Sequence, residues 1–495
     1  MTRGDLDPPQ RPGPLPPGRG RGALIDAVAA ELAHLPRGAA VVVALSGGPD
    51  STALAYLATE ARPDLIVTLV HVRHGLRDDT EDVVVVERHA AYLGLALEIT
   101  AVAVARSGRG LEAAARDARY AALRRVASDR GAEAILVGHT ADDQAETVVL
   151  RIARGTGVGG LAAMRPRSAD LVRPLLRLRR ADLRRFVALE GLPVASDPTN
   201  DDARLRRVLV RSQVLPLLGE VGPDPVGALG RLAALAAEDD DALGALADAA
   251  FGEVAVRCGD VLAVRDEQLE RLPAAVQRRL WRRVFADLGQ ALPPPAAVIA
   301  DLLALRAGRR LQVGALEVSA GGGWRAVAPR RSIPSPPRPL QLPGTTRWDP
   351  AGIAVEVRTP GSVAADGTTT GQITFELSGA WTLPVPALGG LAPPPGGTAE
   401  RCVLALPTEL VHAGLELRHR RPGDRCRAVG GTRRVADVFV DARVPRPVRD
   451  RWPLLVAGDR VVWIPGVVVD AEVLAAGRAA PAAQLLAVPS TPAPR

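Results

Sequence analysis

A short polar segment, Ser46-Gly47-Gly48-Pro49-Asp50-Ser51, ends an apolar run and is followed at once by a helix-like pattern. Its two glycines accept positive φ angles and let a backbone approach a ligand closely. A helix that starts here would point its free amides and its positive dipole end at the same place. Together with the two serine hydroxyls, this predicts a phosphate site. The carboxylate of Asp50 would repel a bare phosphate, so it predicts a divalent cation, Mg²⁺, between the two.

The segment matches neither of two common phosphate-binding patterns. It lacks the GK[ST] of a Walker A loop and the GxGxxG of a dinucleotide fingerprint. A glycine-containing turn between a strand and a helix, capped by a serine, is the alternative that needs no ligand.

A second set of polar residues follows the apolar run at 134–138. It consists of Gly138, His139 and Thr140, and then of Asp142, Asp143 and Glu146. Asp143 and Glu146 are spaced i,i+3 and share a helix face. Two carboxylates there can hold an ammonium group, and one can take a proton, since only a neutral amine is nucleophilic. Acids that only complement the helix dipole, and a purely structural His139, are the alternatives.

Both groups fall where strands and helices alternate. Apolar runs predict strands over 40–45, 65–72, 95–104 and 134–138, and helical spacing predicts helices over 23–35, 51–61, 79–93, 110–130 and 142–154. This alternation predicts an α/β fold with a parallel sheet that carries helices on both faces. Ligands of such sheets bind at the carboxyl ends of the strands, so the loops after the first, second and fourth strands should form the site.

The rest of the chain divides by composition. Residues 1–22 are predicted to be a disordered leader, 23–218 a domain that carries both polar groups, and 219–329, with helical spacing over 225–310, a helical domain. A proline-rich linker follows at 330–344. Short β-like runs between glycines and prolines predict a β-rich region over 345–495.

Charge and cysteine content narrow the function classes. The net charge is +7, and all 62 residues counted as lysine or arginine are arginines. The segment from Glu416 to Arg451 contains eleven arginines and five acids, an excess of +6 that attracts polyanions. A solvated arginine-rich surface is the alternative.

The three cysteines form no CxxC pair, which argues against a zinc ribbon, an iron–sulfur site or a disulfide framework and predicts a reducing, cytoplasmic location. No apolar stretch reaches the length of a membrane span.

The six-residue segment resembles the signature SGGxDS of the PP-loop ATP pyrophosphatase family at every fixed position. Further motifs are similar to those of the tRNA(Ile)-lysidine synthases, at residues 71–77, 110–123, 138–164, 171–186, 196–218 and, in the basic segment, 417–455. The resemblance implies that ATP adenylates O2 of the wobble cytidine in an isoleucine tRNA with a CAU anticodon. The amine of free L-lysine then displaces AMP, which changes the tRNA's identity from methionine to isoleucine.

The resemblance also implies roles for single residues. Mg²⁺ would lie on Asp50, and ATP would be held by Ser46, Gly47, Gly48, Pro49, Asp50, Ser51, Gly138 and His139. Lysine would be held by Asp143 and Glu146, which are catalytic together with Asp50 and Arg116. His74 and Arg77 would line the adenosine or RNA side. The tRNA would be bound by Arg207 and Arg211, spaced i,i+4, and in the C-terminal region by Arg420, Arg421, Arg433 and Arg434. The sequence leaves open whether the chain forms a homodimer.

Two positions depart from the family pattern: Val208 stands where asparagine is usual, and Arg73 where asparagine or aspartate is common. Two rival functions are also considered. A PP-loop tRNA thiolase that relies on paired cysteines is disfavoured because residues 1–257 contain no cysteine. A non-catalytic tRNA-binding protein with the same fold is disfavoured by the intact polar residues of the predicted site, Ser46, Asp50, Asp143 and Glu146.

Overall fold

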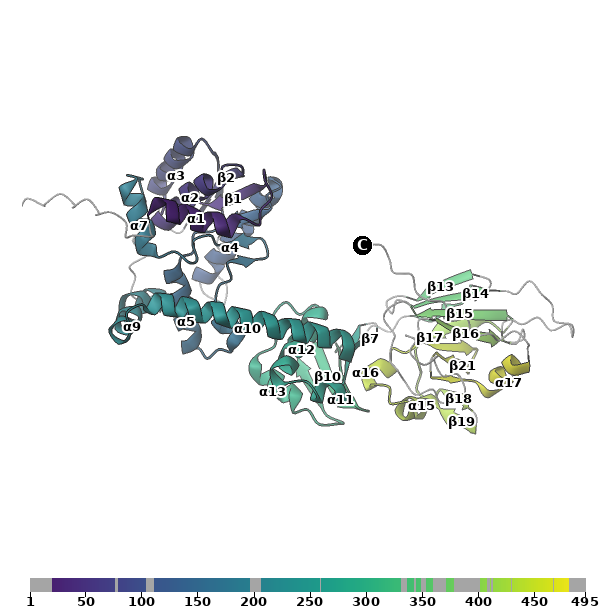
Figure 1. Cartoon of the computed structure of the whole chain (residues 1–495). Helices are drawn as coiled ribbons and strands as arrows, with labels where there is room; N and C mark the ends of the chain where they lie inside the picture. Colours follow the sequence, from purple (N-terminus) through teal and green to yellow (C-terminus); the bar gives the residue numbers. More distant parts are fainter. Residues whose placement is uncertain are drawn as a thin grey trace, which may run out of the picture. The chain divides into compact units, whose positions relative to one another are not determined.

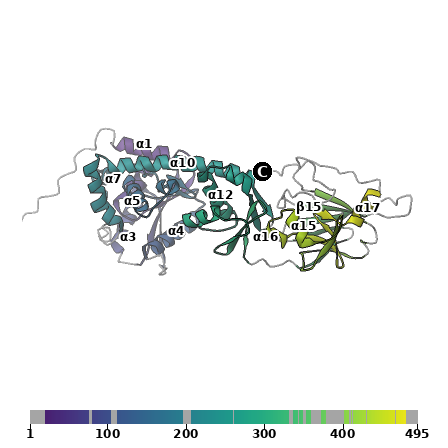
Figure 2. The same cartoon turned by 90° about the horizontal axis from the view of Figure 1, so that it is seen from below.

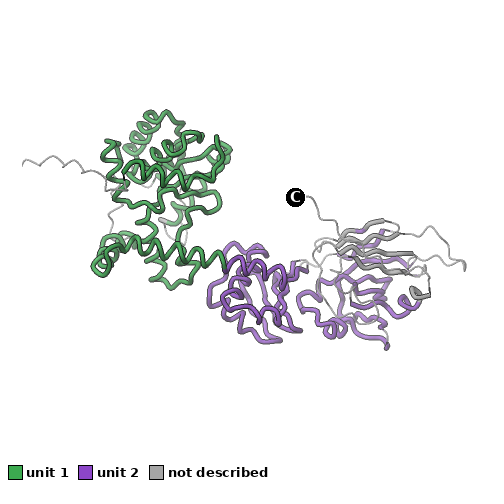
Figure 3. The backbone as a smooth tube through the Cα atoms, viewed as in Figure 1, with its two compact units in different colours: residues 1–242 green, residues 243–495 purple. Residues whose placement is uncertain are grey.

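A computed structural model describes residues 20–479 except for 76–78, 104–110, 196–205, 259, 331–335, 342–343, 349–352, 359–370, 378–400, 407–409, 411–412, 429 and 466. Arg77, most of the predicted leader and part of the predicted linker therefore lie outside the described residues. The chain divides into two compact units, residues 1–242 and 243–495 (Figure 3). The division falls inside a helix, α10 (Pro225–Val254), and not at the boundary predicted at residue 218, so the finer domain limits stay predictions.

The first unit is built on the predicted parallel sheet. Its strands are β1 (Ala40–Ala44), β2 (Ile66–Arg73), β3 (Ala96–Ala101), β4 (Ala134–Leu136), β5 (Arg167–Ser168) and β6 (Leu171–Val172). They lie in the order β3-β2-β1-β4-β6-β5, with β1 parallel to both β2 and β4 and the short edge strand β5 antiparallel to β6. This order places the carboxyl ends of β2, β1 and β4 side by side, as the sequence predicts for the site.

The predicted helices of this unit are present (Figures 1 and 2): α1 (Arg21–Leu32), α2 (Pro49–Ala61), α3 (Thr80–Leu93), α4 (Leu111–Asp129) and α5 (Ala141–Ala153). The structure adds helices that the sequence pattern did not predict: α6 (Val158–Leu161), α7 (Arg180–Leu189), α8 (Arg206–Leu209), a π-helical turn η2 (Val210–Val214), and α9 (Leu215–Val221) ahead of α10. In the described part of the chain, no helix combines the length and the apolarity that a membrane crossing requires.

The apolar run of β1 serves two cores, one on each face of the sheet. Val41 and Val43 belong to a core shared with α1, α2 and α7, whereas Val42 belongs to a core shared with α4. All three valines are 1% exposed or less. Because both faces are covered, successive residues must be apolar, which explains why this strand reads as a continuous β-branched run. The loop that follows β1 is therefore attached to a fully buried strand.

Residues 225–310 are less helical than predicted. Besides α10, the helices here are α11 (Asp266–Glu270), α12 (Ala274–Asp287) and α13 (Ala296–Leu303). Between and after them runs a five-stranded antiparallel sheet of β7 (Ala255–Cys258), β8 (Val261–Arg265), β9 (Arg310–Val313), β10 (Leu316–Gly321) and β11 (Trp324–Pro329). In β8, Leu262 and Ala263 belong to different core clusters. A strand that is buried on both faces lacks the period-2 alternation by which strands are recognised, so the sequence pattern missed it.

The C-terminal region is β-rich, as predicted. One sheet has the order β12-β17-β20-β21-β18-β19 with β22 beside β21, and a second has the order β13-β14-β15-β16. The strands are β12 (Arg338–Pro339), β13 (Gly344–Trp348), β14 (Ile353–Arg358), β15 (Gly371–Leu377), β16 (Arg401–Leu406), β17 (Leu415–Arg418), β18 (Arg425–Ala428), β19 (Gly431–Arg434), β20 (Leu454–Ala457), β21 (Arg460–Ile464) and β22 (Val468–Val469). The helices are α15 (Val435–Asp441), α16 (Arg446–Arg449) and α17 (Ala471–Ala479). The basic segment, residues 416–451, is therefore part of a folded region of strands and helices.

Candidate active site

A cavity of about 550 Å³ lies at the carboxyl ends of β1, β2 and β4. It is lined after β1 by Ser46 and by residues 48–51, after β2 by His74 and Gly75, and after β4 by Gly138 and His139. Helical residues also line it, among them Asp82, Arg116, Arg119, Tyr120, Asp143 and Arg207. The loops after the first, second and fourth strands therefore meet in one cavity, which confirms the position predicted from the order of the elements.

Hydrogen bonds within the loop between β1 and α2 fix its conformation. Gly47 has a φ of +85°, a conformation that favours glycine. The Ser51 hydroxyl donates to the Gly48 carbonyl at 2.9 Å and accepts from the Ser46 amide at 3.1 Å. The two serine hydroxyls, predicted as phosphate donors, also bond to each other at 3.0 Å, so they shape the loop.

The start of α2 provides the free donors. Pro49 is its first residue and brings no amide hydrogen, and no side chain caps the helix. Thr52 donates its amide to the Gly48 carbonyl at 3.0 Å. The amides of Asp50 and Ser51 precede the first intrahelical bond, so helix geometry leaves them without an intrahelical partner. Two amides and the helix dipole are thus available to an anion at the cavity.

Gly138 lets the end of β4 approach this helix start. A Cβ atom at this position would lie 3.2 Å from the Asp50 carbonyl oxygen and 3.3 Å from the Ser51 Cα, both backbone atoms. The contact explains the glycine without a ligand, although Gly138 also lines the cavity.

Gly138→Ala is expected to lower the rate of the ATP-dependent step that the sequence motifs imply by roughly 5- to 100-fold, because forcing a methyl group into a packed contact costs about 1–3 kcal/mol and shifts the loop. The measurement is diphosphate release at several ATP concentrations. Gly219→Ala is the control, since a Cβ there meets nothing within 4 Å. Equal rates for both variants would contradict the packing role.

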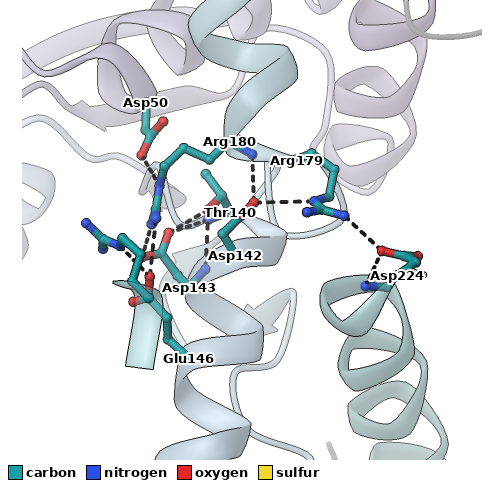
Figure 4. A network of polar contacts seen from close by, with 10 residues as sticks. Asp50, Thr140, Asp142, Asp143, Glu146, Arg179, Arg180 and Asp224 are labelled. Carbon is teal, nitrogen blue, oxygen red and sulfur yellow. Dashed lines mark hydrogen bonds and ion pairs between the residues drawn. The ribbon is translucent and has the colours of Figure 1, made fainter. Parts of the chain in front are cut away.

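Three carboxylates and one arginine form a network beside the loop (Figure 4). The Arg180 side chain donates from Nη2 to Asp143 Oδ1 at 2.7 Å, from Nη1 to Glu146 Oε1 at 3.2 Å, and from Nε to Asp50 Oδ2 at 3.2 Å. Its main-chain amide donates to Asp142 Oδ2 at 2.8 Å. The network therefore joins the loop of β1 to the start of α5 through the first residue of α7.

Asp143 also stabilises the start of helix α5. Its Oδ2 accepts from the Thr140 amide and hydroxyl, both at 2.8 Å, and these two residues form a capping box at the start of α5. The sequence suggested a structural role in complementing the helix dipole, and the structure adds a role in capping the helix. Although burial raises the pKa of Asp143, Arg180 and the Thr140 hydrogen bonds outweigh it and hold that pKa below its usual value.

Glu146 is fully buried, with a side-chain exposure of 0%. Its Oε1 accepts from Arg180 and, at 2.8 Å, from Arg211 Nε. Its Oε2 is buried and has no hydrogen-bond partner among the described residues. One oxygen of this carboxylate is thus held by two guanidinium groups, and the other can serve a ligand.

Asp50 fits the predicted place of a magnesium ion. Its Oδ1 is buried without a hydrogen-bond partner among the described residues, and carboxylate oxygens suit Mg²⁺. Burial raises the pKa of Asp50, and Arg180 offsets part of that rise. Within the described residues no group of three or more His, Cys, Asp or Glu side chains could hold a metal by itself. An ion on Asp50 would therefore take its other ligands from phosphates and water.

Three guanidinium groups, those of Arg116, Arg119 and Arg207, line the same cavity. Arg116 and Arg119 lie 5.2 and 5.7 Å from the centroid of the Tyr120 ring, which stabilises cations over its face. Burial lowers the pKa of His139 to about 3 and also lowers that of His74, so both imidazoles are neutral at pH 7. The positive charge that the cavity offers to an anion comes from its arginines.

Comparison with known proteins identifies the family to which this chain belongs. A family model described as a PP-loop domain matches residues 25–218, and one described as the TilS substrate C-terminal domain matches residues 415–485. A tRNA(Ile)-lysidine synthase from Symbiobacterium thermophilum is 34% identical over 468 residues, which cover 87% of this chain and 90% of that protein. The enzyme of the same name from Geobacter sulfurreducens is 32% identical, over 86% of this chain and 88% of that protein. The one from Thermobifida fusca is 43% identical, over 56% of this chain and 85% of that protein. This chain belongs to the tRNA(Ile)-lysidine synthase family.

Membership confirms the resemblance that the motifs carry. As a tRNA(Ile)-lysidine synthase family member the chain is an ATP-using ligase of tRNA modification, with an N-terminal PP-loop domain and a C-terminal substrate domain. The thiolase and the non-catalytic tRNA-binding protein, which were the rival interpretations, do not agree with the relatives that match over nearly the whole chain.

Two arginines predicted to act together on tRNA have different surroundings in this family member. Arg207 lies on α8 and lines the cavity, whereas Arg211 lies in the π-helical turn and pairs with Glu146. A contact of either residue with tRNA stays a prediction.

The four C-terminal arginines predicted to bind tRNA divide into two kinds. Arg420 and Arg433 are ion-paired with Asp450 and Asp441. The other two, Arg421 and Arg434, are exposed. Their role in tRNA binding stays a prediction.

Sequence reasoning assigned no role to Arg180, although the residue lies inside the quoted motif at 171–186. Nothing in local spacing indicates that it reaches Asp50, which lies 130 positions away. Of the two departures from the family pattern, Arg73 forms an ion pair with Asp79 at 2.7 Å and so ties the end of β2 to the start of α3. Nothing in the structure explains Val208.

Proposed function

We propose that the chain joins free L-lysine to C2 of the wobble cytidine in an isoleucine tRNA with a CAU anticodon. In the first step the cytidine O2 attacks the α-phosphorus of ATP, and diphosphate leaves. In the second step the amine of lysine attacks C2, and AMP leaves with the electron pair of the C–O bond. The observation that supports this best is the network in which Arg180 joins Asp50 of the phosphate-binding loop to Asp143 and Glu146.

The loop and its surroundings would serve the first step. The amides of Asp50 and Ser51 are suited to the phosphates of ATP, and Asp50 Oδ1 would hold Mg²⁺, which when bound would neutralise phosphate charge. Arg116 and Arg207 line the same cavity and would orient the anionic groups that react there. His139, neutral and buried, would contact the nucleotide without adding charge.

The carboxylates at the start of α5 would serve the second step. Glu146 Oε2 is buried and unpartnered among the described residues, so it can accept a hydrogen bond from the amine of lysine and take its proton. Asp143 would contribute negative charge while it remains the cap of α5. The cytoplasmic location indicated by the unpaired cysteines suits such a reaction and stays a prediction.

The C-terminal arginines would hold the tRNA through its phosphates. Replacing both Arg421 and Arg434 with alanine is expected to weaken tRNA binding and to reduce the slope of log affinity against log salt by about two, since each phosphate contact contributes about one. Binding is measured between about 50 and 200 mM salt. Arg427→Ala is the control, because this exposed arginine is paired with Glu472. An unchanged slope in the double variant would contradict the assignment.

Incorporation of labelled lysine tests the proposed function directly. The full chain, ATP, magnesium and unmodified isoleucine tRNA(CAU) should yield labelled tRNA, whereas the elongator methionine tRNA, offered as a competitor, should stay unlabelled. If folded protein that binds tRNA incorporates no lysine, the proposal is wrong. Equal labelling of the methionine tRNA would contradict the proposed tRNA choice.

A further inference from the structure

Arg180 connects the two parts of the site. Its side chain is 10% exposed, and each of its three donor nitrogens meets a different carboxylate, on Asp50, Asp143 and Glu146 (Figure 4). The shortest of these contacts, 2.7 Å, is to Asp143. Five donors in a fixed planar fork let one arginine set several carboxylates relative to one another, which a lysine cannot do in the same way.

The backbone that carries Arg180 is itself fixed. Its amide donates to Asp142 Oδ2 at 2.8 Å, which docks the first residue of α7 onto the first turn of α5. Further along α7, Leu183 and Phe186 are buried in the core that also contains β1. The guanidinium therefore projects from a packed helix and not from a mobile loop.

The contacts of Arg180 help to fix the orientation of the Glu146 carboxylate. Arg180 and Arg211 both donate to Oε1, which fixes the carboxylate while Oε2 stays buried and unpartnered among the described residues. A buried acceptor without a donor is costly, so this oxygen is suited to accept a hydrogen bond from a ligand.

We propose that Arg180 is a positioning residue for amine transfer: by binding Asp143 and Glu146 it holds Glu146 with one oxygen directed to the amine of lysine. This inference rests on the proposed function, because it takes lysine as the second substrate. The role assigned to Arg180 is indirect. It acts through Glu146, so its loss should be felt at the lysine step more than at adenylation.

The test uses full-length Arg180→Gln and Arg180→Lys, with Arg179→Gln as the matched control. Arg179 precedes Arg180 and pairs instead with Asp142 and Asp224. Two readouts are compared: diphosphate release with tRNA and ATP in the absence of lysine, and the KM for lysine in the complete reaction. For Arg180→Gln we expect the lysine KM to rise about 10- to 100-fold. Because Arg180 also contacts Asp50, adenylation is measured at saturating magnesium and ATP, where we expect it to stay within about fivefold of the wild type. Arg180→Lys keeps the charge without the fork and should lie between the wild type and Arg180→Gln.

The outcomes separate the inference from the proposed function. A wild-type protein that incorporates no lysine would overturn the proposed function itself. If the wild type is active but Arg180→Gln keeps the wild-type lysine KM, Arg180 is not a positioning residue for the amine. Equal losses of adenylation and lysine incorporation would assign it to the nucleotide loop or to folding and would also overturn the inference. Thermal unfolding checks that each variant is folded, and Arg180→Lys provides the same comparison if Arg180→Gln does not fold.

Discussion

Asp50→Asn is expected to reduce lysine incorporation by at least about 100-fold. Loss of an outer partner of a metal ligand already costs about 10–100-fold, and Asp50 is proposed as a direct ligand. Asparagine has nearly the same shape, so the cavity is preserved, but the negative charge beside the phosphate-binding amides is lost. The measurement is the incorporation of labelled lysine into isoleucine tRNA(CAU) at saturating ATP and lysine.

Glu60→Gln is the matched control for this experiment. Glu60 lies on the same helix, α2, but pairs with Arg21, whose side chain is 52% exposed. Its variant should keep wild-type activity. The tRNA affinity of Asp50→Asn should also match that of the wild type, because the arginines assigned to tRNA are unchanged. Full activity of Asp50→Asn would refute the role of this carboxylate at the magnesium ion.

Glu146→Gln is expected to slow lysine transfer by roughly 10²- to 10⁴-fold, the usual contribution of a positioned general base. The amide is similar in shape but can neither take the proton of the amine nor pair with an ammonium group. Adenylation should continue, because Glu146 meets the nucleotide loop only through Arg180. The experiment therefore follows two products: diphosphate, which should be released, and lysine-labelled tRNA, which should be nearly absent.

Asp170→Asn controls for the loss of a carboxylate from the same unit. Asp170 pairs with Arg124, whose side chain is 52% exposed, and it should be replaceable without loss of either product. Should Glu146→Gln transfer lysine at the wild-type rate, the amine must be deprotonated elsewhere. If diphosphate release also stopped, Glu146 would belong to the first step.

The sequence predicted those parts of the site that depend on neighbouring residues. The loop at residues 46–51 and the acids of α5 each follow a buried strand, and both the strands and the helix starts are local features of the chain. Because adjacent parallel strands end at the same edge of a sheet, the alternation of elements was enough to bring the two groups to one cavity. The sequence also indicated that the acids at the start of α5 could complement the helix dipole, but it did not predict the capping box that Asp143 forms with Thr140.

The parts that the sequence did not predict depend on distant residues. Arg180 and Glu146 are 34 positions apart, and Arg211 and Glu146 are 65 apart. No periodicity links such pairs, because their meeting is decided by the packing of α7 and of the π-helical turn against α5. Strand β8 was missed for a different reason. It is buried on both faces, so its sequence lacks the alternation of apolar and polar residues by which a strand is recognised.

The capping box of α5 has a consequence for how this site would change if the reaction were lost. Asp143 completes the capping box by accepting from the Thr140 amide, and a capping interaction is worth about 0.5–2 kcal/mol, so Asp143 stabilises the fold whether or not any chemistry is performed. Glu146 is tied to the fold in another way, because its buried carboxylate pairs with Arg180 and Arg211, and its loss would leave buried charge uncompensated. A descendant that had abandoned the reaction would therefore be expected to keep both carboxylates.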